Sequence, residues 1–163
     1  MIITHTQLKE VLEYDPDTGL LKWLVTRGRV KAGYVAGRCR PDGYVTIKVD
    51  GRDYLAHRLA WLWTTGLWPL DEIDHKDGNP NNNRWSNLRQ ATSRQNHYNS
   101  RRMTRNVSGV KGVLWVAAEQ RWVARVRAPD GRSHTKRCLS KEDAAAFYKA
   151  RAEELHGEFV RTA

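Results

Sequence analysis

The chain has 163 residues, a formal net charge of +10 and a pI near 9.9. That length is enough for one compact domain or two small modules, and the positive excess favours a polyanionic partner such as nucleic acid. Cys39 and Cys138 lie far apart without a Cys-x-x-Cys pair, which excludes a cysteine-ligated zinc ribbon and indicates two buried thiols. No apolar run is long enough to span a bilayer and the N-terminus lacks a signal-peptide core, so we expect a cytoplasmic protein.

The N-terminal part of the chain predicts a helix, a strand, a hairpin and a second helix. Leu and Val recur at helical spacing within 4–13, and an Asp-Pro-Asp-Thr-Gly turn then leads into a strand at 20–25. Residues 40–59 alternate in polarity and contain two Asp-Gly turns, which is typical of a hairpin. The run 58–66 predicts a helix that ends at Gly66.

A strand, a polar loop and a helix are predicted next. Residues 72–100 begin with a short apolar and acidic strand, pass through a loop dense in Asn, Asp, Gly and Pro, and enter a helix near Thr92. Residues 99–108 have almost no apolar content, so we interpret them as a basic linker. This linker would join a first module, 1–98, to a second module, 109–163.

The second module predicts a small sheet and one helix. Ser140 is a candidate N-cap, acidic residues follow it, and Gly157 stands just past the expected helix end. The three candidate strands are 109–116, 121–128 and 133–139, and the helix is 141–156. The predicted fold class for the whole chain is therefore α+β.

The positive charge is concentrated in one segment. Residues 84–137 contain thirteen Lys and Arg and two acidic residues, whereas the rest of the chain contains fifteen basic and sixteen acidic residues. One segment thus carries the entire excess, as expected if it follows a phosphate backbone.

The dipeptide Asp74-His75 is the candidate for chemistry. Hydrolysis of a phosphodiester needs an activated water and stabilisation of the departing oxygen; an imidazole suits the first task and a hard cation on oxygen ligands the second. Neighbouring side chains at a strand end point to opposite sides, so both would reach one centre only if the chain turns, which the residues at 76–78 favour. A lone Asp-His pair is more often part of a surface loop.

The surrounding residues supply the missing context. The motifs HRLAW, IDHKDGN, NNR, SNLR and QNHYN follow in order within 57–99. Together they resemble the HNH, or ββα-metal, homing endonuclease family in its zinc-free phage and intron branch. The resemblance implies that His75 is the general base, that Asp74 and Asn96 bind one divalent cation, Mg²⁺ or Mn²⁺, and that Asn87 braces the loop orienting His75.

Three further positions match the family pattern with less defined roles. They are His57, Asn83 and Arg84. His57 is either a core histidine at a helix start or a further catalytic side chain, and both readings stay open. The family commonly has Asp where this chain has Asn82; because an amide can replace a carboxylate in a structural hydrogen bond, we expect catalysis to survive the change.

The second module resembles the ethylene-response-factor (Apetala-two) DNA-binding domain. The matching motifs are SGVKGV, RWVARVR, EDAA and LHGEF, within 107–159. The resemblance implies that a three-stranded sheet enters the major groove while a helix packs behind it. Alternation along 121–127 places three arginines on one face, a suitable arrangement for guanine edges and phosphates. Arg125 stands where plant members commonly carry Glu, so the base preference is not transferable.

The expected DNA contacts lie in the basic segment. Trp115 is assigned to DNA stacking, with sheet–helix packing as the alternative. The full candidate set is Arg84, Arg101, Arg102, Arg105, Lys111, Trp115, Arg121, Arg125, Arg127, Lys136 and Arg137.

These features predict a metal-dependent, site-directed endonuclease of double-stranded DNA. One metal centre per chain favours a monomer that nicks one strand, whereas a dimer would permit a double-strand break. The main rival is a non-catalytic DNA-binding regulator on a decayed nuclease fold. A third reading is an RNA-binding protein, for which RNA would outcompete duplex DNA.

Overall fold

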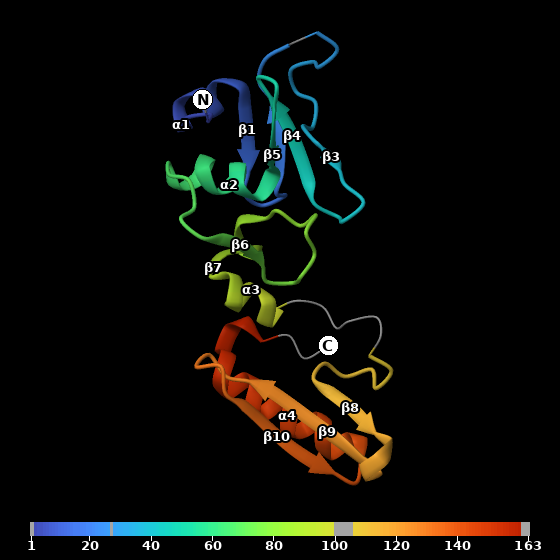
Figure 1. Ribbon diagram of the computed structural model, residues 1–163. Helices are drawn as coiled ribbons and strands as arrows, with labels where there is room; N and C mark the ends of the chain where they lie inside the picture. The colour runs from blue at the N-terminus through green and yellow to red at the C-terminus, as the bar shows by residue number, and fades with distance from the viewer. Residues whose placement is uncertain (1, 27, 100–105, 161–163) are drawn as a thin grey trace. The chain divides into compact units, whose positions relative to one another are not determined.

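The chain divides into two compact units, Met1–Thr92 and Ser93–Ala163, in a mixed α+β fold. The computed structural model describes residues 2–26, 28–99 and 106–160, and each unit is taken by itself (Figure 1). The division precedes the expected boundary at 98/99, because helix α3, Ser93–Asn99, packs within the second unit. Among the described residues, no helix has the length and apolar character needed to cross a membrane.

The first unit begins with α1, His5–Val11, and a hairpin of β1, Leu12–Asp15, with β2, Leu20–Trp23. Thr4 caps α1 in a capping box with Gln7. The sequence predicted a helix as far as residue 13, but the helix ends at Val11. From Leu12 the side chains alternate between buried and exposed, which suits a strand that covers the core on one face.

The predicted hairpin at 40–59 is confirmed as part of a three-stranded antiparallel sheet. Its strands are β3, Arg38–Cys39, β4, Val45–Val49, and β5, Arg52–Leu55. Ile47 and Val49 point into the core, where α2, Ala56–Thr65, packs beside α1. As predicted, α2 ends at Gly66, which adopts the left-handed conformation with φ of 79°.

A second hairpin completes the first unit. It pairs β6, Glu72–His75, with β7, Leu88–Ala91, after a short 3-10 turn at Trp85–Asn87. The sequence predicted β6 but not β7. The residues of β7 include Arg89 and Gln90, and these polar side chains break the apolar pattern by which a strand is predicted from sequence.

In the second unit, α4 covers one face of an antiparallel sheet (Figure 1). Val113, Ala124 and Val126 pack against Ala144 and Tyr148 of the helix. The elements after α3 are β8, Val113–Val116, β9, Arg121–Arg127, β10, Ser133–Cys138, and α4, Lys141–His156, with 3-10 turns at Ala117–Glu119 and Gly157–Phe159. The predicted three strands and helix are present.

The two cysteines differ in exposure, which corrects one expectation. Cys138 is buried against α4, as predicted. Cys39 is exposed, because β3 is a two-residue edge strand whose side chains both remain in solvent.

Candidate functional site

The hairpin of β6 and β7 positions Asp74 and His75 at its end. In the register of this hairpin, Asp74 lies opposite Arg89 and His75 lies opposite Leu88. The side chains of Asp74 and His75 are only 3% and 4% exposed. The chain turns directly afterwards, with the Gly78 amide donating to the His75 carbonyl at 2.7 Å. This is the turn that the sequence required.

A hydrogen bond fixes the protonation of His75. Its Nε2 lies 3.0 Å from Oδ1 of Asn83. Because an amide oxygen only accepts, Nε2 carries the hydrogen and Nδ1 is the basic nitrogen. Burial lowers the pKa of His75, while Asn83 and the carboxylates of Asp77 and Asp74 oppose that effect only in part. His75 is therefore a neutral imidazole at neutral pH, the form a general base needs.

Arg89 neutralises the carboxylate of Asp74. Its Nε and Nη2 atoms both approach Oδ2 of Asp74, at 2.8 and 2.7 Å. Both side chains are buried, so each charge depends on the other. From the sequence alone, Arg89 is only one of the positive charges of the basic segment. Its role follows from the β6–β7 register, which was not predicted.

His57 of α2 lies directly against His75. The two ring centroids are 5.0 Å apart in an edge-to-face arrangement, and the ring of Tyr44 lies 5.5 Å from His57 and 6.0 Å from His75. His57 is 4% exposed, and its Nδ1 has no hydrogen-bond partner among the described residues. Burial, helped by His75 and Arg58, lowers the pKa of His57 to about 3. Tyr44 is a member of this cluster that the sequence does not predict.

Asn87 braces the loop that follows His75. Its Oδ1 accepts from the Asp77 amide at 3.0 Å, and its Nδ2 donates to Oδ1 of Asp77 and to the Asn82 carbonyl. The Asn82 side chain donates to Oδ2 of Asp77 at 2.7 Å. An aspartate at position 82 would instead face a like charge. In this chain, the amide at position 82 therefore strengthens the loop.

These hydrogen bonds also keep Asp77 ionised. Burial by itself would raise the pKa of Asp77, but hydrogen bonds from Asn82, the Asn79 amide and Asn87 outweigh it and lower the pKa below its ordinary value. The loop is thus organised around one carboxylate.

The β1–β2 hairpin supports the same loop from behind. The hydroxyl of Tyr14 donates to the Asn83 carbonyl at 2.7 Å. Gly19 has φ of +76°, and a Cβ there would lie 2.4 Å from the Arg84 amide nitrogen. Backbone therefore meets backbone at a place where no side chain fits. Arg84 itself is exposed at the end of this loop.

Asn96 lies on α3, in the second unit. Its assignment as a metal ligand beside Asp74 stays a prediction. The second unit holds α3 through the ring of Tyr98, which stacks on His156 at 3.7 Å, and through Lys111, which donates to the Tyr98 carbonyl at 2.6 Å. Lys111, expected at DNA, thus already serves an internal contact.

The register of the second sheet sorts the remaining candidates by face. Arg125 of β9 lies opposite Thr135, Arg127 lies opposite Ser133, and Val123 lies opposite Arg137. These positions share the face that points away from α4, where Arg125, Arg127 and Arg137 are exposed and Arg121 is half-buried. We call Arg121, Arg125, Arg127 and Arg137 the arginine face.

Trp115 and Lys136 lie on the other side of this sheet. Trp115 pairs with Trp122 at a ring distance of 5.2 Å, and Nζ of Lys136 lies 5.5 Å from the centroid of Phe147 on α4. The structure therefore separates both residues from the arginine face. Three further candidates, Arg101, Arg102 and Arg105, lie outside the described residues.

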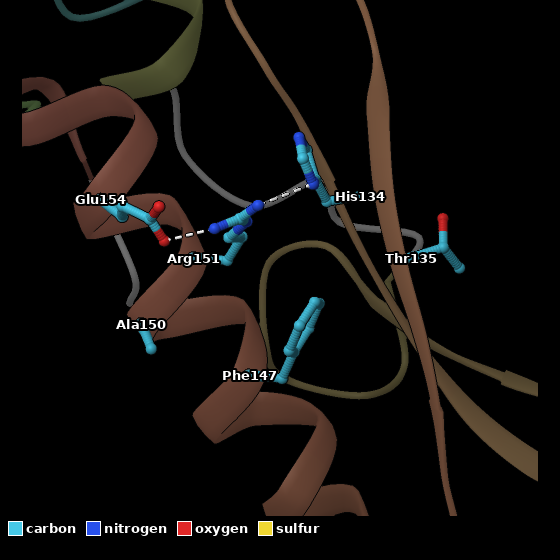
Figure 2. Close-up of a pocket in the computed structure, with 6 residues that line it drawn as sticks. All are labelled: His134, Thr135, Phe147, Ala150, Arg151 and Glu154. Atoms are coloured by element: carbon cyan, nitrogen blue, oxygen red, sulfur yellow. Dashed lines mark hydrogen bonds and ion pairs between the residues drawn. The ribbon is translucent and has the colours of Figure 1, made fainter.

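A pocket between β10 and α4 also lies on the helix side (Figure 2). Arg151 donates to Nδ1 of His134 at 3.1 Å and pairs with Glu154, above the rings and methyl groups of Phe147 and Ala150. The two charged groups that line the pocket, Arg151 and Glu154, thus pair with each other.

Comparison with known proteins finds sequence similarity to HNH endonucleases. A family model described as HNH endonuclease matches residues 54–98. Protein 3.8 of Escherichia phage T7 is 34% identical over 107 residues, which cover 64% of this chain and 88% of that protein. An uncharacterized HNH endonuclease of Acanthamoeba polyphaga mimivirus is 40% identical over 121 residues, which cover 73% of this chain and 62% of that protein. The structure titled "DNA binding and cleavage by the HNH homing endonuclease I-HmuI" is 26% identical with a TM-score of 0.43, covering 89% of this chain and 77% of its own.

Proposed function

We propose that this chain, which belongs to the HNH endonuclease family, is a site-directed endonuclease that hydrolyses phosphodiester bonds of double-stranded DNA. The observation that carries the proposal is the buried pair Asp74-His75, in which Asn83 fixes the tautomer of His75 and Arg89 fixes the carboxylate of Asp74. We keep the cytoplasm as the expected compartment and a monomer as the expected state.

His75 supplies the base in this mechanism. Its Nδ1 takes a proton from a water molecule, the oxygen of that water attacks the phosphorus atom, and the bond to the 3′ oxygen breaks. Asn83 accepts from Nε2 throughout, so the ring stays oriented as it becomes a cation. His57 and Tyr44 shield the ring from bulk water, which keeps the resting imidazole neutral.

A divalent cation, Mg²⁺ or Mn²⁺, held by Asp74 and Asn96 would supply positive charge to the departing oxygen. The donor chemistry fits, because a carboxylate and an amide oxygen are ligands that hard cations prefer. In the described parts of the chain, no three His, Cys, Asp or Glu side chains form a metal-binding group.

The second unit would select the site. We propose that its arginine face enters the major groove, in the manner of the Apetala-two domain that its sequence resembles. The support is that three exposed arginines lie on one face of a rigid sheet whose other face is covered by α4. Guanidinium forks suit guanine edges and phosphates.

The test is plasmid nicking in the presence of Mg²⁺ or Mn²⁺ by the wild type and the His75→Ala variant. We expect the variant to lose activity by about 10²-fold or more, the range that a positioned base contributes. His5→Ala is the matched control, because His5 lies on α1 and bonds to the Trp63 carbonyl, outside the site. Equal nicking by wild type and His75→Ala would refute the base. Tight, salt-sensitive binding without any cleavage would favour the regulator, and preference for RNA would favour the RNA-binding protein.

A further inference from the structure

The first unit has a basic stretch of its own. Residues 20–40 contain no Asp or Glu. They contain six basic residues: Lys22, Arg27, Arg29, Lys31, Arg38 and Arg40. The small net charge of the first unit as a whole conceals this stretch, because the acidic residues of the unit lie before and after it.

The register of β3, β4 and β5 brings the end of this stretch onto one face of the sheet. Arg38 lies opposite Thr46, and Lys48 lies opposite Asp53. Residues directly opposite one another project to the same side, so these four share a face. Because Ile47, between Thr46 and Lys48, points into the core, the four residues lie on the side of the sheet turned away from the core. We call Arg38, Thr46, Lys48 and Asp53 the outer sheet face.

Two adjoining hollows follow this face. They have volumes of about 360 and 350 Å³, and both are lined by Arg38, Thr46 and Asp53. One hollow extends to Arg40 and the other to Lys48. Together they form a concave strip with cations at both ends.

The charges of this strip are available to a ligand. In the described part of the chain, neither Arg38 nor Lys48 takes part in an ion pair, whereas Arg40 pairs with Asp42 at 2.8 Å. Thr46 is 8% exposed, and its hydroxyl has no hydrogen-bond partner among the described residues. Asp53 is the carboxylate that lines both hollows, against the cations of Arg38, Arg40 and Lys48.

We propose that the outer sheet face binds the sugar–phosphate backbone of duplex DNA, with Arg38 and Lys48 each contacting a phosphate. This inference rests on the proposed function and adds a second DNA contact to the arginine face. Two separated cations along a concave strip suit successive phosphates, and such contacts fix register without reading sequence. The His75 centre belongs to the same unit, so this contact would hold the substrate on the unit that cleaves it.

The test compares DNA affinity of the full chain across salt concentrations, with a short duplex and EDTA present to prevent cleavage. The double variant Arg38→Gln/Lys48→Gln should bind several-fold more weakly. Its plot of log affinity against log salt should be shallower by about 1.8, since each lost phosphate contact removes about 0.9. Arg52→Gln is the matched control, because Arg52 lies on the same sheet opposite the core-facing Val49. It should leave both the affinity and the slope unchanged.

A charge-conserving double variant, Arg38→Lys/Lys48→Arg, should retain wild-type binding and would show that charge is what matters. One outcome would overturn the DNA contact of the outer sheet face and leave the proposed function intact. In it, Arg38→Gln/Lys48→Gln keeps the wild-type salt slope of DNA affinity, whereas Arg125→Gln/Arg127→Gln makes that slope shallower. If the wild type shows no salt-dependent DNA binding, both proposals fail. Loss of affinity for poly-glutamate but not for DNA would assign the face to an acidic protein and overturn the inference.

Discussion

The loop around His75 in the first unit and the arginine face of the second unit are both polar, but they are built in opposite ways. The loop buries His75, Asp74, Asn83 and Asn87 and gives each a specified hydrogen-bond partner. The arginine face leaves Arg125 and Arg127 in solvent. Burial fixes geometry and protonation, as chemistry requires, whereas exposure keeps charge available to a polyanion. Substitutions should therefore act on stability and turnover in one region and on salt-dependent affinity in the other.

The largest effect should come from Arg89→Ala. The change leaves the Asp74 carboxylate buried without its cation, and breaking a buried pair in this way costs about 3–5 kcal/mol. Urea unfolding should show this loss, and Arg84→Ala, at an exposed position, should change stability by less than about 0.5 kcal/mol. An equally small effect of both variants would show that the pair is not closed in solution.

Asn83→Ala should reduce turnover without weakening DNA binding. It removes the acceptor that fixes the His75 tautomer, and a lost buried hydrogen bond of about 1–3 kcal/mol corresponds to roughly fivefold to 150-fold in rate. Nicking at saturating DNA measures the effect. Asn83→Asp keeps an acceptor but adds a negative charge, so it should raise the pKa of His75. The inflection of the pH–rate profile should therefore move to higher pH. An unshifted profile would contradict the assignment of Asn83.

Acid should destabilise the first unit through His57. Its pKa falls from an ordinary 6.5 to about 3 in the folded protein, so the unfolded chain binds the proton first as pH drops. Stability is therefore complete above about pH 6.5 and declines below it, by up to about 1.4 kcal/mol per pH unit from this group. The lowered pKa of His75 acts in the same direction. His57→Gln should flatten the decline measured by urea unfolding between about pH 7 and about pH 5; an identical slope would show that His57 is not buried in solution.

The smallest effect on fold or turnover should come from Arg125→Gln/Arg127→Gln. Both side chains are exposed, so stability should change by less than about 0.5 kcal/mol. The salt dependence of DNA affinity should become shallower by about 1.8 if both arginines contact phosphate. A change in base preference without a change in slope would instead assign them to guanine edges.

The sequence predicted elements whose pattern is local. The alternation at 40–59 and the glycine after α2 gave the hairpin and the helix end, and alternation along β9 gave the arginine face. What it missed depends on pairing across the chain. The strand β7 contains a polar residue, Arg89, whose partner is Asp74 on β6. The side of the sheet on which Trp115 and Lys136 lie follows from the registers of β8 and β10 with β9.

Within the candidate site, the sequence named the reactive pair but not what holds it. The sequence does not distinguish the side-chain partners of the three consecutive asparagines at 81–83. Only the fold shows that Asn83 reaches His75 and that Asn82 donates to Asp77. Tyr44 arrives from a different hairpin. Similarly, a single charge total for all residues outside 84–137 concealed the basic stretch at 20–40.

The contact of Gly19 and Tyr14 with the backbone of the loop around His75 bears on how the proposed active site could be minimised or transplanted. The family match begins at residue 54, yet Tyr14 and Gly19, which lie well before that residue, support the loop from behind. A fragment that starts at residue 54 would keep every residue proposed to react but would lose the β1–β2 hairpin against which their loop packs. For an engineer, the smallest portable unit therefore begins at the N-terminus and extends through α3, which carries Asn96. Position 19 is a place where even one added methyl group would displace the loop.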